Sequence, residues 1–461
     1  MPENAPTRNP PPPVAPGGEA APPESSLSRD LGLFHTTMLV MGGIVGAGIF
    51  INPYVVAREI HSPAEILSAW ALGGLVAMAG AFVYAELAAR MPEVGGQYAY
   101  LREAYQPAVA FLYGWALLLV VETGGMAAVA VTFARYAREL APLGLSDAAL
   151  AALALGVLTL INCVGVRAGG TVQSSLMVLK ILAIAFLVVC GWLLIRPAPP
   201  AALPPPVPAA GALAAFAAAM APVLFSYGGY QTANFVAGEV KRPEVTLPRG
   251  LVLGVAGVGA LYLAVNAVAL RALGAAGLSR ATAPASAVMR LALGSRGGEI
   301  IAAGIAISAL GFLSQSMLTA PRVYYAMARD GVFFRGVGWL DPRSRVPTVA
   351  IILQGFWAAV IAVSGRYEQI LNYMISVDLL FMGLTATCLF RARFRAGRES
   401  ARFRVPGHPW TTLGYILASW LVVLGTVVHD PFHAGIGFAI LGAGAPVYWL
   451  WRRRRIPREG G

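Results

Sequence analysis

The sequence predicts an all-α membrane protein with about twelve transmembrane helices, on three observations. Of its 461 residues, 57% are hydrophobic and only 12% are charged. The mean hydropathy is +0.67, whereas a soluble protein of this length needs far more polar surface. The apolar residues also fall in long runs, and a helix needs about 20 such residues to cross the hydrocarbon core of a bilayer.

The apolar runs follow one another along the whole chain, apart from its two ends. The first six expected spans cover 33–57, 66–90, 107–136, 148–166, 172–194 and 212–236. The second six cover 251–272, 299–328, 348–363, 370–390, 413–428 and 436–451. We therefore expect one transmembrane domain over 31–452, in which the last two spans, within about 411–452, follow two groups of five.

The two ends of the chain lack this apolar pattern. Residues 1–30 are rich in Pro, Gly and Ala and predict a disordered tail rather than a signal peptide, whose apolar core would lie close to Met1. Residues 453–461 form a short basic tail. The three cysteines, Cys163, Cys190 and Cys388, fall within or beside expected helices and predict no disulfide framework.

Basic residues predict the orientation, because short loops rich in Lys and Arg remain in the cytoplasm. The densest groups are 391–404 and 452–455, and both lie on the side that also carries the chain ends. The sequence thus predicts a multi-pass protein of the cell (inner) membrane with both termini in the cytoplasm. A solvated inner face explains these groups better than nucleic-acid binding, so no nucleic-acid partner is expected.

Two glycine-rich interruptions mark the first and sixth spans. Gly42, Gly43, Gly46 and Gly48 interrupt the first, and the pair 228–229 interrupts the sixth. Close helix packing is one explanation, since glycine lets helices approach. Their positions, each opening one half of the chain, favour a 5+5 inverted-repeat transporter with broken helices 1 and 6, the repeats covering about 31–195 and 212–391.

Other function classes have weaker signals. A channel would need polar rings along a continuous pore, whereas here the glycine and polar residues gather at two mid-membrane breaks. The chain carries no zincin helix, nucleophile elbow or phosphate-binding Walker loop, which argues against a membrane enzyme and direct ATP drive. His429, Asp430 and His433 predict an exposed loop rather than a metal site. No metal or cofactor is expected.

Four stretches resemble the L-type amino-acid transporter group of the amino acid, polyamine and organocation (APC) superfamily. They are GGIVGAGIF (42–50), YAELAARMPEVGGQYAYLREAY (84–105), LFSYGGYQTANFVAGEVKRPEVTLPRG (224–250) and APRVYYAMARDGVFF (320–334). The resemblance spans 31 to about 406. It implies twelve helices, the inverted repeat and a permease that carries amino acids through the membrane, not an enzyme.

The resemblance also implies a substrate site at the two breaks. Its head-group residues would be Ile44, Val45, Gly46, Ala47, Gly48, Phe225, Ser226, Tyr227, Gly228, Gly229 and Gln231. Phe225 matches the aromatic that closes the outer gate, and ordinary packing is the alternative. Gln231 and Asn234 would either bind a substrate side chain or cap the unwound segment. Tyr230 and Gly238 depart from the pattern, which predicts a different side-chain pocket.

Three acidic residues lie in expected spans, where each charge is costly. Two interpretations of Glu122 remain open: a functional carboxyl, which takes up a proton or selects cationic substrates, and a hydrogen-bonded structural carboxyl. We interpret Asp378 as part of a structural pair. Glu86 predicts an ion pair at the inner face.

Lys180 predicts transport that does not use sodium. The resemblance places it where many sodium-independent members carry a lysine, whose ammonium replaces a sodium ion between the first break and helix 8. Ser308 and Gly311 are the expected partners there. A compact ammonium with three donors can bridge such carbonyls, and a buried lysine that loses its proton could couple transport to pH. The alternative is a lysine that snorkels to the cytoplasmic face.

The expected partners are a small amino-acid substrate and the lipid bilayer. The breaks offer backbone groups for a zwitterion, which predicts a neutral or broad range of amino acids, with a cationic amino-acid or polyamine carrier as the alternative. Exchange and proton coupling both remain open. The loop 137–147 has no cysteine, so no disulfide-linked heavy subunit is expected.

Overall fold

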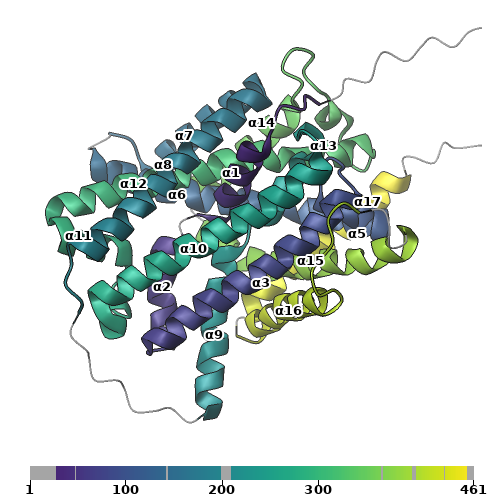
Figure 1. Cartoon of the computed structure of the whole chain (residues 1–461). Helices are drawn as coiled ribbons and strands as arrows, with labels where there is room; N and C mark the ends of the chain where they lie inside the picture. The colour runs from purple at the N-terminus through teal and green to yellow at the C-terminus, as the bar shows by residue number, and fades with distance from the viewer. Residues whose placement is uncertain are drawn as a thin grey trace, which may run out of the picture.

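A computed structural model describes residues 27–46, 48–141, 144–198, 209–364, 367–396, 401–429 and 431–453. These ranges are almost entirely helical, and an isolated parallel bridge pairs Leu31 with Val240. Figure 1 shows the long helices packed side by side in one bundle. The predicted all-α fold class is confirmed.

The helices follow the predicted spans in order. The first half consists of α1 (Leu33–Ile44), α2 (Gly48–Glu59), α3 (Pro63–Arg90), α4 (Gln97–Ala104), α5 (Pro107–Ala116), the π-helix η1 (Leu117–Val121), α6 (Glu122–Leu140), α7 (Asp147–Val164) and α8 (Val166–Leu193). The second half consists of α9 (Ala209–Tyr227), the 3₁₀-helix η2 (Tyr230–Glu239), α10 (Pro243–Leu278), α11 (Pro284–Leu293), α12 (Ser295–Thr319), α13 (Pro321–Arg329), the 3₁₀-helix η3 (Arg335–Gly338), α14 (Thr348–Ser364) and α15 (Tyr367–Ala396). Two further helices, α16 (Trp410–His429) and α17 (Pro431–Arg453), end the described chain.

Helix starts coincide with prolines. Proline has no backbone N–H and a fixed φ, so it suits the first turn of a helix, where that N–H would lack a helical partner. It occupies the first position of α3, α5, α10, α11 and α13. In α10 this proline is Pro243, and the helix therefore begins eight residues before the apolar run that predicts it.

Among the described residues, eight helical segments are long and apolar enough to cross a membrane. The pair α1 and α2, bent by 42° at its break, forms a ninth. The other three expected spans correspond to α9 with η2, to α14 and to α15. The protein is therefore a multi-pass membrane protein.

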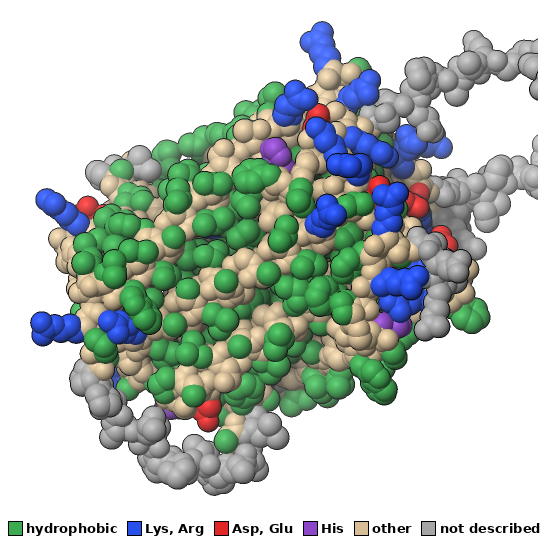
Figure 2. Space-filling model, viewed as in Figure 1, with side chains coloured by type: hydrophobic (Ala, Val, Ile, Leu, Met, Phe, Trp, Pro, Cys, Tyr) green, Lys and Arg blue, Asp and Glu red, His purple; other side chains and the backbone are tan. Residues whose placement is uncertain are grey.

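The molecular surface has an apolar belt with basic ends. Figure 2 shows hydrophobic side chains across the middle of the bundle, while Lys and Arg gather mainly at one end, near α13 and α17. Many of the large apolar side chains on the long helices are exposed, among them Leu160, Leu182, Leu253 and Phe356. Such a belt matches the hydrocarbon of a bilayer and the basic end matches its charged surface.

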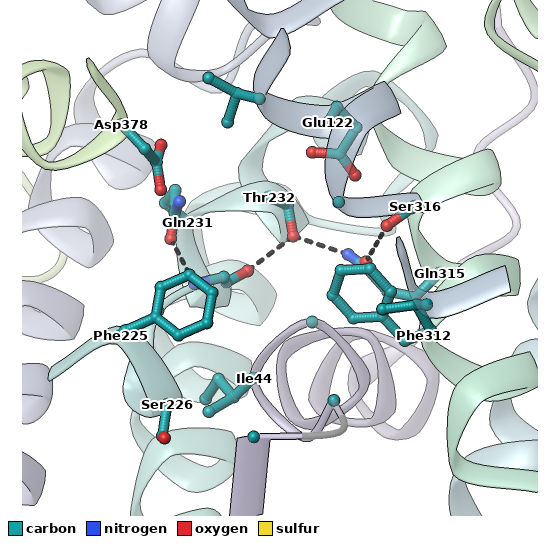
Figure 3. A pocket seen from close by; sticks show the side chains of 18 of the residues that line it. Ile44, Glu122, Phe225, Ser226, Gln231, Thr232, Phe312, Gln315, Ser316 and Asp378 are labelled. Atoms are coloured by element: carbon teal, nitrogen blue, oxygen red, sulfur yellow. Dashed lines mark hydrogen bonds between the residues drawn. The ribbon is translucent and has the colours of Figure 1, made fainter. Parts of the chain in front are cut away.

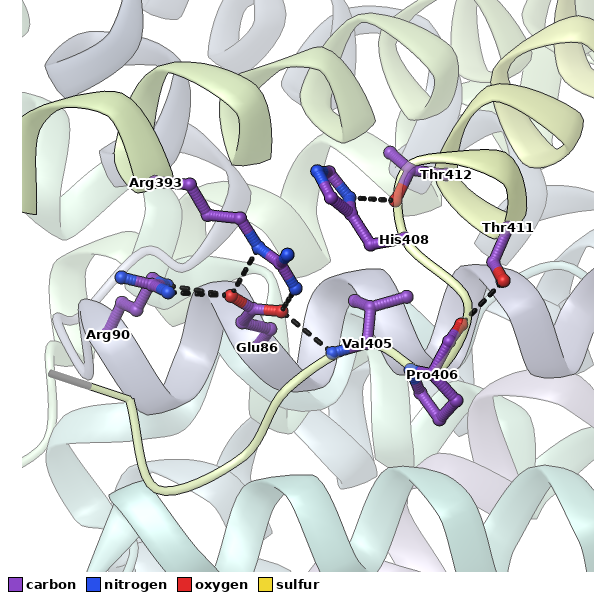
Figure 4. Close-up of polar contacts among 8 residues, drawn as sticks. All are labelled: Glu86, Arg90, Arg393, Val405, Pro406, His408, Thr411 and Thr412. Carbon is purple, nitrogen blue, oxygen red and sulfur yellow. Dashed lines mark hydrogen bonds and ion pairs between the residues drawn. The ribbon is translucent and has the colours of Figure 1, made fainter. Parts of the chain in front are cut away.

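A buried carboxylate fixes the connection between α15 and α16. The Glu86 side chain, fully buried on α3, accepts hydrogen bonds from Arg90 at 2.9 Å, from Arg393 at 2.9 and 2.5 Å, and from the Val405 amide at 2.7 Å. Figure 4 shows all three donors converging on this one carboxylate. The interactions with the two arginines provide the ion pair expected of Glu86.

Candidate functional site

The two helix breaks lie backbone against backbone in the middle of the bundle. Gly229 has φ +101°, a conformation that favours glycine. A Cβ there would lie 2.2 Å from the Gly43 carbonyl oxygen, and one on Gly43 would lie 2.6 Å from the Gly229 carbonyl oxygen. Both positions therefore need glycine, which is why the sequence interrupts two apolar helices at these points.

Side chains from three neighbouring helices bind the carbonyls that the first break frees. The Tyr262 hydroxyl of α10 lies 3.1 Å from both the Ile44 and the Ser226 carbonyl oxygens. The Lys180 ammonium of α8 donates to the Val45 carbonyl, and the Ser308 hydroxyl of α12 donates to that of Gly46 at 3.4 Å. Three consecutive carbonyls are thus held in place, one by each of the three helices.

Lys180 lies deep in the bundle. Its exposed fraction is 0%, and a Cβ on Gly311 of α12 would lie 3.3 Å from its Cε. A snorkelling lysine would place its ammonium in water, so this geometry excludes that alternative. The residue joins α8 to the first break, beside α12.

A cavity of about 310 Å³ borders the two breaks. This volume is within the range of small-molecule sites. Its lining comes from α1, α2, α5, η1, α6, α9, η2, α12 and α15, so both halves of the chain contribute. Figure 3 looks into this cavity.

A chain of hydrogen bonds crosses one wall of the cavity, from the second break to α12. The Gln231 side-chain oxygen accepts from the Gly229 amide at 3.1 Å, and the Gly229 carbonyl accepts from the Thr232 hydroxyl at 2.7 Å. The Gln315 amide then donates to Thr232 at 2.6 Å, and the Ser316 hydroxyl lies 3.5 Å from Gln315 (Figure 3). Gln231 therefore caps the break while it lines the cavity.

The cavity is accessible beside α2 and α9. On these helices the lining residues Ile51 and Phe225 are 42% and 38% exposed. The Asn52 amide of α2 donates to the Ser226 hydroxyl at 2.6 Å and to the Pro222 carbonyl at 3.1 Å, which ties the two helices together. The aromatic expected to close the gate thus lies at an open mouth.

The opposite end of the site is closed. Arg322 of α13 donates to both carboxylate oxygens of Glu239, at 2.9 and 2.8 Å, and both side chains are fully buried. The Leu31 amide donates to the Glu239 carbonyl at 3.0 Å and the Lys241 amide donates to that of Leu31 at 2.8 Å. The segment before α1 therefore holds the end of η2.

Two acidic side chains lie on the wall of the cavity. Glu122 begins α6 directly after the π-helix η1, a rare type of helix that is frequently found at functional sites. It is 8% exposed and lies within hydrogen-bonding reach of the Ser316 hydroxyl. Asp378 of α15 also lines the cavity. Asp378 has no ion-pair partner among the described residues, so the structure does not support the structural pair expected for it.

The structure brings most of the expected site residues together. The cavity is lined by Ile44, Gly46, Gly48, Glu122, Phe225, Ser226, Gly228, Gly229 and Gln231. Ala47 is outside the described residues. Lys180, Ser308 and Gly311 lie behind the first break.

Four other expected residues point away from the cavity. The Val45 carbonyl is bound by Lys180, and the Tyr227 hydroxyl donates to the Trp70 carbonyl at 3.1 Å. Tyr230 donates to Tyr415 of α16 at 2.6 Å, and Asn234 donates to the Tyr84 carbonyl at 3.3 Å. Tyr230 therefore does not shape the side-chain pocket as the sequence suggests, but connects η2 to α16.

Several cavity residues were not among the expected site residues. They are Asn52, Tyr113, Thr132, Thr232, Phe312, Gln315, Ser316 and Met382. Polar residues at turn spacing on α12, Ser308, Gln315 and Ser316, are a signal that could have marked that helix as facing the site. No group of three or more His, Cys, Asp or Glu that could hold a metal occurs within the part of the chain that the structure describes.

Comparisons with known proteins agree with this geometry. A family model described as amino acid permease matches residues 31–447. The serine/threonine exchanger SteT of Bacillus subtilis is 29% identical over 440 residues, 94% of this chain and 99% of that protein. The human b(0,+)-type amino acid transporter 1 is 28% identical, over 84% of this chain and 80% of the relative, and the human large neutral amino acids transporter small subunit 2 is 27% identical, over 94% and 84%. These relatives are transporters, not enzymes, and the chain belongs to the amino acid permease family.

Proposed function

We propose that the cavity at the two breaks binds the head group of an amino acid, and that the protein carries it by alternating access without sodium. The observation that supports this most directly is the Lys180 ammonium on the Val45 carbonyl, next to the cavity. Transport would be driven either by exchange or by coupling to protons. The name of the Bacillus relative states exchange for that protein.

The ends of the four half-helices match the charges of an amino-acid head group. Helix N-termini carry partial positive charge and helix C-termini carry partial negative charge. The N-termini of α2 and η2 would receive the substrate carboxylate, while its ammonium would face the negative ends of the α1 and α9 dipoles. This arrangement recognises a zwitterion through backbone groups alone.

The environment of Lys180 supports sodium independence. A sodium ion at the first break would need carbonyl and hydroxyl oxygens, and Lys180 with Ser308 occupies the carbonyls available there. The fixed ammonium carries the positive charge that the ion would otherwise bring. A cation at this depth costs on the order of 2.5–3.5 kcal/mol on insertion scales, and its hydrogen bond to the break offsets part of that cost.

The proposed setting is the cell (inner) membrane, with both termini in the cytoplasm. The end of the bundle that carries most Lys and Arg includes the start of α1, and basic residues favour the cytoplasmic side. On this orientation the mouth beside α2 and α9 faces outward and the Glu239 and Arg322 pair closes the inner side. No disulfide-linked heavy subunit is needed.

Uptake by the full chain in proteoliposomes tests the proposal. We expect labelled amino acids to accumulate equally with external sodium or choline, faster when the vesicles contain unlabelled substrate or a proton gradient is imposed. Lys180→Ala should lower uptake roughly 10- to 100-fold, because a charged hydrogen bond at the break is lost. Lys241→Ala, which removes the other, exposed lysine, is the matched control. A strict sodium requirement, or normal uptake by folded Lys180→Ala, would contradict the assignment.

A further inference from the structure

The cavity is lined by two carboxyl side chains that an amino-acid head group does not use. Glu122 and Asp378 line it from α6 and α15, on the side away from the α1 break, and Figure 3 shows both carboxylates facing the interior beside Gln231 and Thr232. The proposed function already assigns both head-group charges to the ends of the broken helices. The two carboxylates are therefore available to the substrate side chain.

The described part of the cavity wall offers these carboxylates no cation. Its lining residues include no Lys, Arg or His, and Lys180 lies behind the break with its ammonium on Val45. Among the described residues Glu122 has the Ser316 hydroxyl nearby and no cation, although more than nine-tenths of its surface is buried. Carboxylates inside a membrane are costly unless a positive charge or hydrogen-bond donors compensate them.

A cation that arrives with the substrate would supply this compensation. The ammonium or guanidinium of a basic amino acid would lie between the two helices that carry the acids, at the end of a flexible chain long enough to leave the head group at the breaks. A neutral polar side chain would need only hydrogen-bonding groups such as those of Gln231 and Ser316, which the wall already provides. The two acids would have no role in binding it.

We propose that Glu122 and Asp378 form the side-chain end of the substrate site and select amino acids with a cationic side chain. The inference rests on the proposed head-group site and narrows its substrate class. It makes Glu122 and Asp378 specificity residues, whereas the breaks bind the part common to all amino acids. Transport of neutral amino acids remains as a slower background.

Lysine and norleucine form the decisive pair of substrates, because norleucine has the four-carbon side chain of lysine without its terminal ammonium. Initial uptake rates by the full chain in proteoliposomes should give a kcat/KM for lysine at least about tenfold above that for norleucine. Glu122→Gln and Asp378→Asn should each lower this ratio by about tenfold or more, because lysine uptake should fall much further than norleucine uptake. Glu139→Gln removes a charge from the exposed end of the same α6 and should keep the wild-type ratio.

Each other outcome has a definite meaning. If norleucine is carried and lysine is not, the two acids are protonated or serve a structural role. The inference then fails, while the proposed function as an amino-acid carrier remains supported. If neither crosses or stabilises the protein, the inference fails, and uptake of the other labelled amino acids decides whether the proposed function stands. Should the two variants not fold, ligand-induced shifts in the Tm of the wild type decide: a larger shift with lysine supports the inference and a larger shift with norleucine overturns it.

Discussion

A single hydroxyl group joins the two breaks at the residue scale. Tyr262 of α10 is fully buried and its hydroxyl is shared between carbonyls at the ends of α1 and α9. Its ring packs against Trp70 and Tyr227, with centroids 5.6 and 5.0 Å away, which fixes its direction. Tyr262 therefore sets how far apart the two ends lie, and so positions the head-group site without lining it.

Tyr262→Phe should slow uptake several-fold and reduce the free energy of unfolding by roughly 1–3 kcal/mol, because the Ile44 and Ser226 carbonyls lose the buried hydroxyl that they share. Its effect should fall on the KM of every amino acid alike, as the head-group site is common to them. Tyr415→Phe, which removes a buried phenol hydroxyl bonded to Tyr230 rather than to a break, is the control. Equal effects of the two variants on KM would show that Tyr262 serves packing alone.

Individual residues were predicted unevenly from the sequence. Glycines at the breaks and Lys180 stand out locally, because each is an unusual choice within an apolar run. The sequence does not show that Asp378 faces the cavity. The side of α15 that does so depends on how the helix packs, which a single sequence does not reveal. Tyr230 was expected at the pocket, but the left-handed turn at Gly229 directs it toward α16.

At the element scale the broken helices form two pairs. Asn52 ties α2 to α9 beside the cavity mouth, and the Leu31 and Val240 bridge ties the start of α1 to the end of η2. Each pair combines one half-helix from the first break with one from the second. Alternating access then requires one pair to close over the cavity as the other opens.

Phe225 tests the first of these movements. Phe225→Ala should reduce uptake about tenfold, because the closed state loses the aromatic ring that would cover the substrate and exclude water. Its effect on thermal stability should be small, since the ring is 38% exposed. Phe356→Ala, on the exposed face of α14, controls for loss of a surface ring. Wild-type uptake by the folded Phe225 variant would reduce the residue to packing.

The Glu239 and Arg322 pair is expected to stabilise the closed end of the site. Glu239→Gln should lower the free energy of unfolding by roughly 3–5 kcal/mol, since it leaves a buried guanidinium without its counter-charge. The double variant Glu239→Gln with Arg322→Gln should recover part of that loss, which a double-mutant cycle of unfolding free energies would measure. Strictly additive losses would mean that the two side chains do not stabilise one another.

Element boundaries show where sequence reasoning reaches its limit. The spans and their order follow from apolar run length, which the bilayer imposes directly. The π-helix at Leu117–Val121 does not, because its five apolar residues look like any helical segment and the change in hydrogen bonding depends on neighbouring helices. The short helices α4 and α11 lie in segments that the apolar pattern treats as loops.

The whole molecule combines an apolar exterior, one basic end and a central cavity that opens on the other side. Ser28 and Arg167 lower the pKa of Asp30 in the segment before α1, so this carboxylate remains charged well into acid and keeps its link to α8. The closed end is therefore held by ionic contacts as well as by the buried pair. The internal repeat that the break positions suggest stays a prediction.

The bridge between Leu31 and Val240 has a practical consequence for anyone who attaches another domain to this protein. If access alternates as proposed, a domain fused at the amino end would be attached to α1 and η2, the half-helices expected to move, and its bulk would slow their movement. A tag placed after α17 would instead ride on a helix that packs against α5, α15 and α16. The carboxyl end is thus the better site for a fusion. A bulky or anchored domain at the amino end would slow transport.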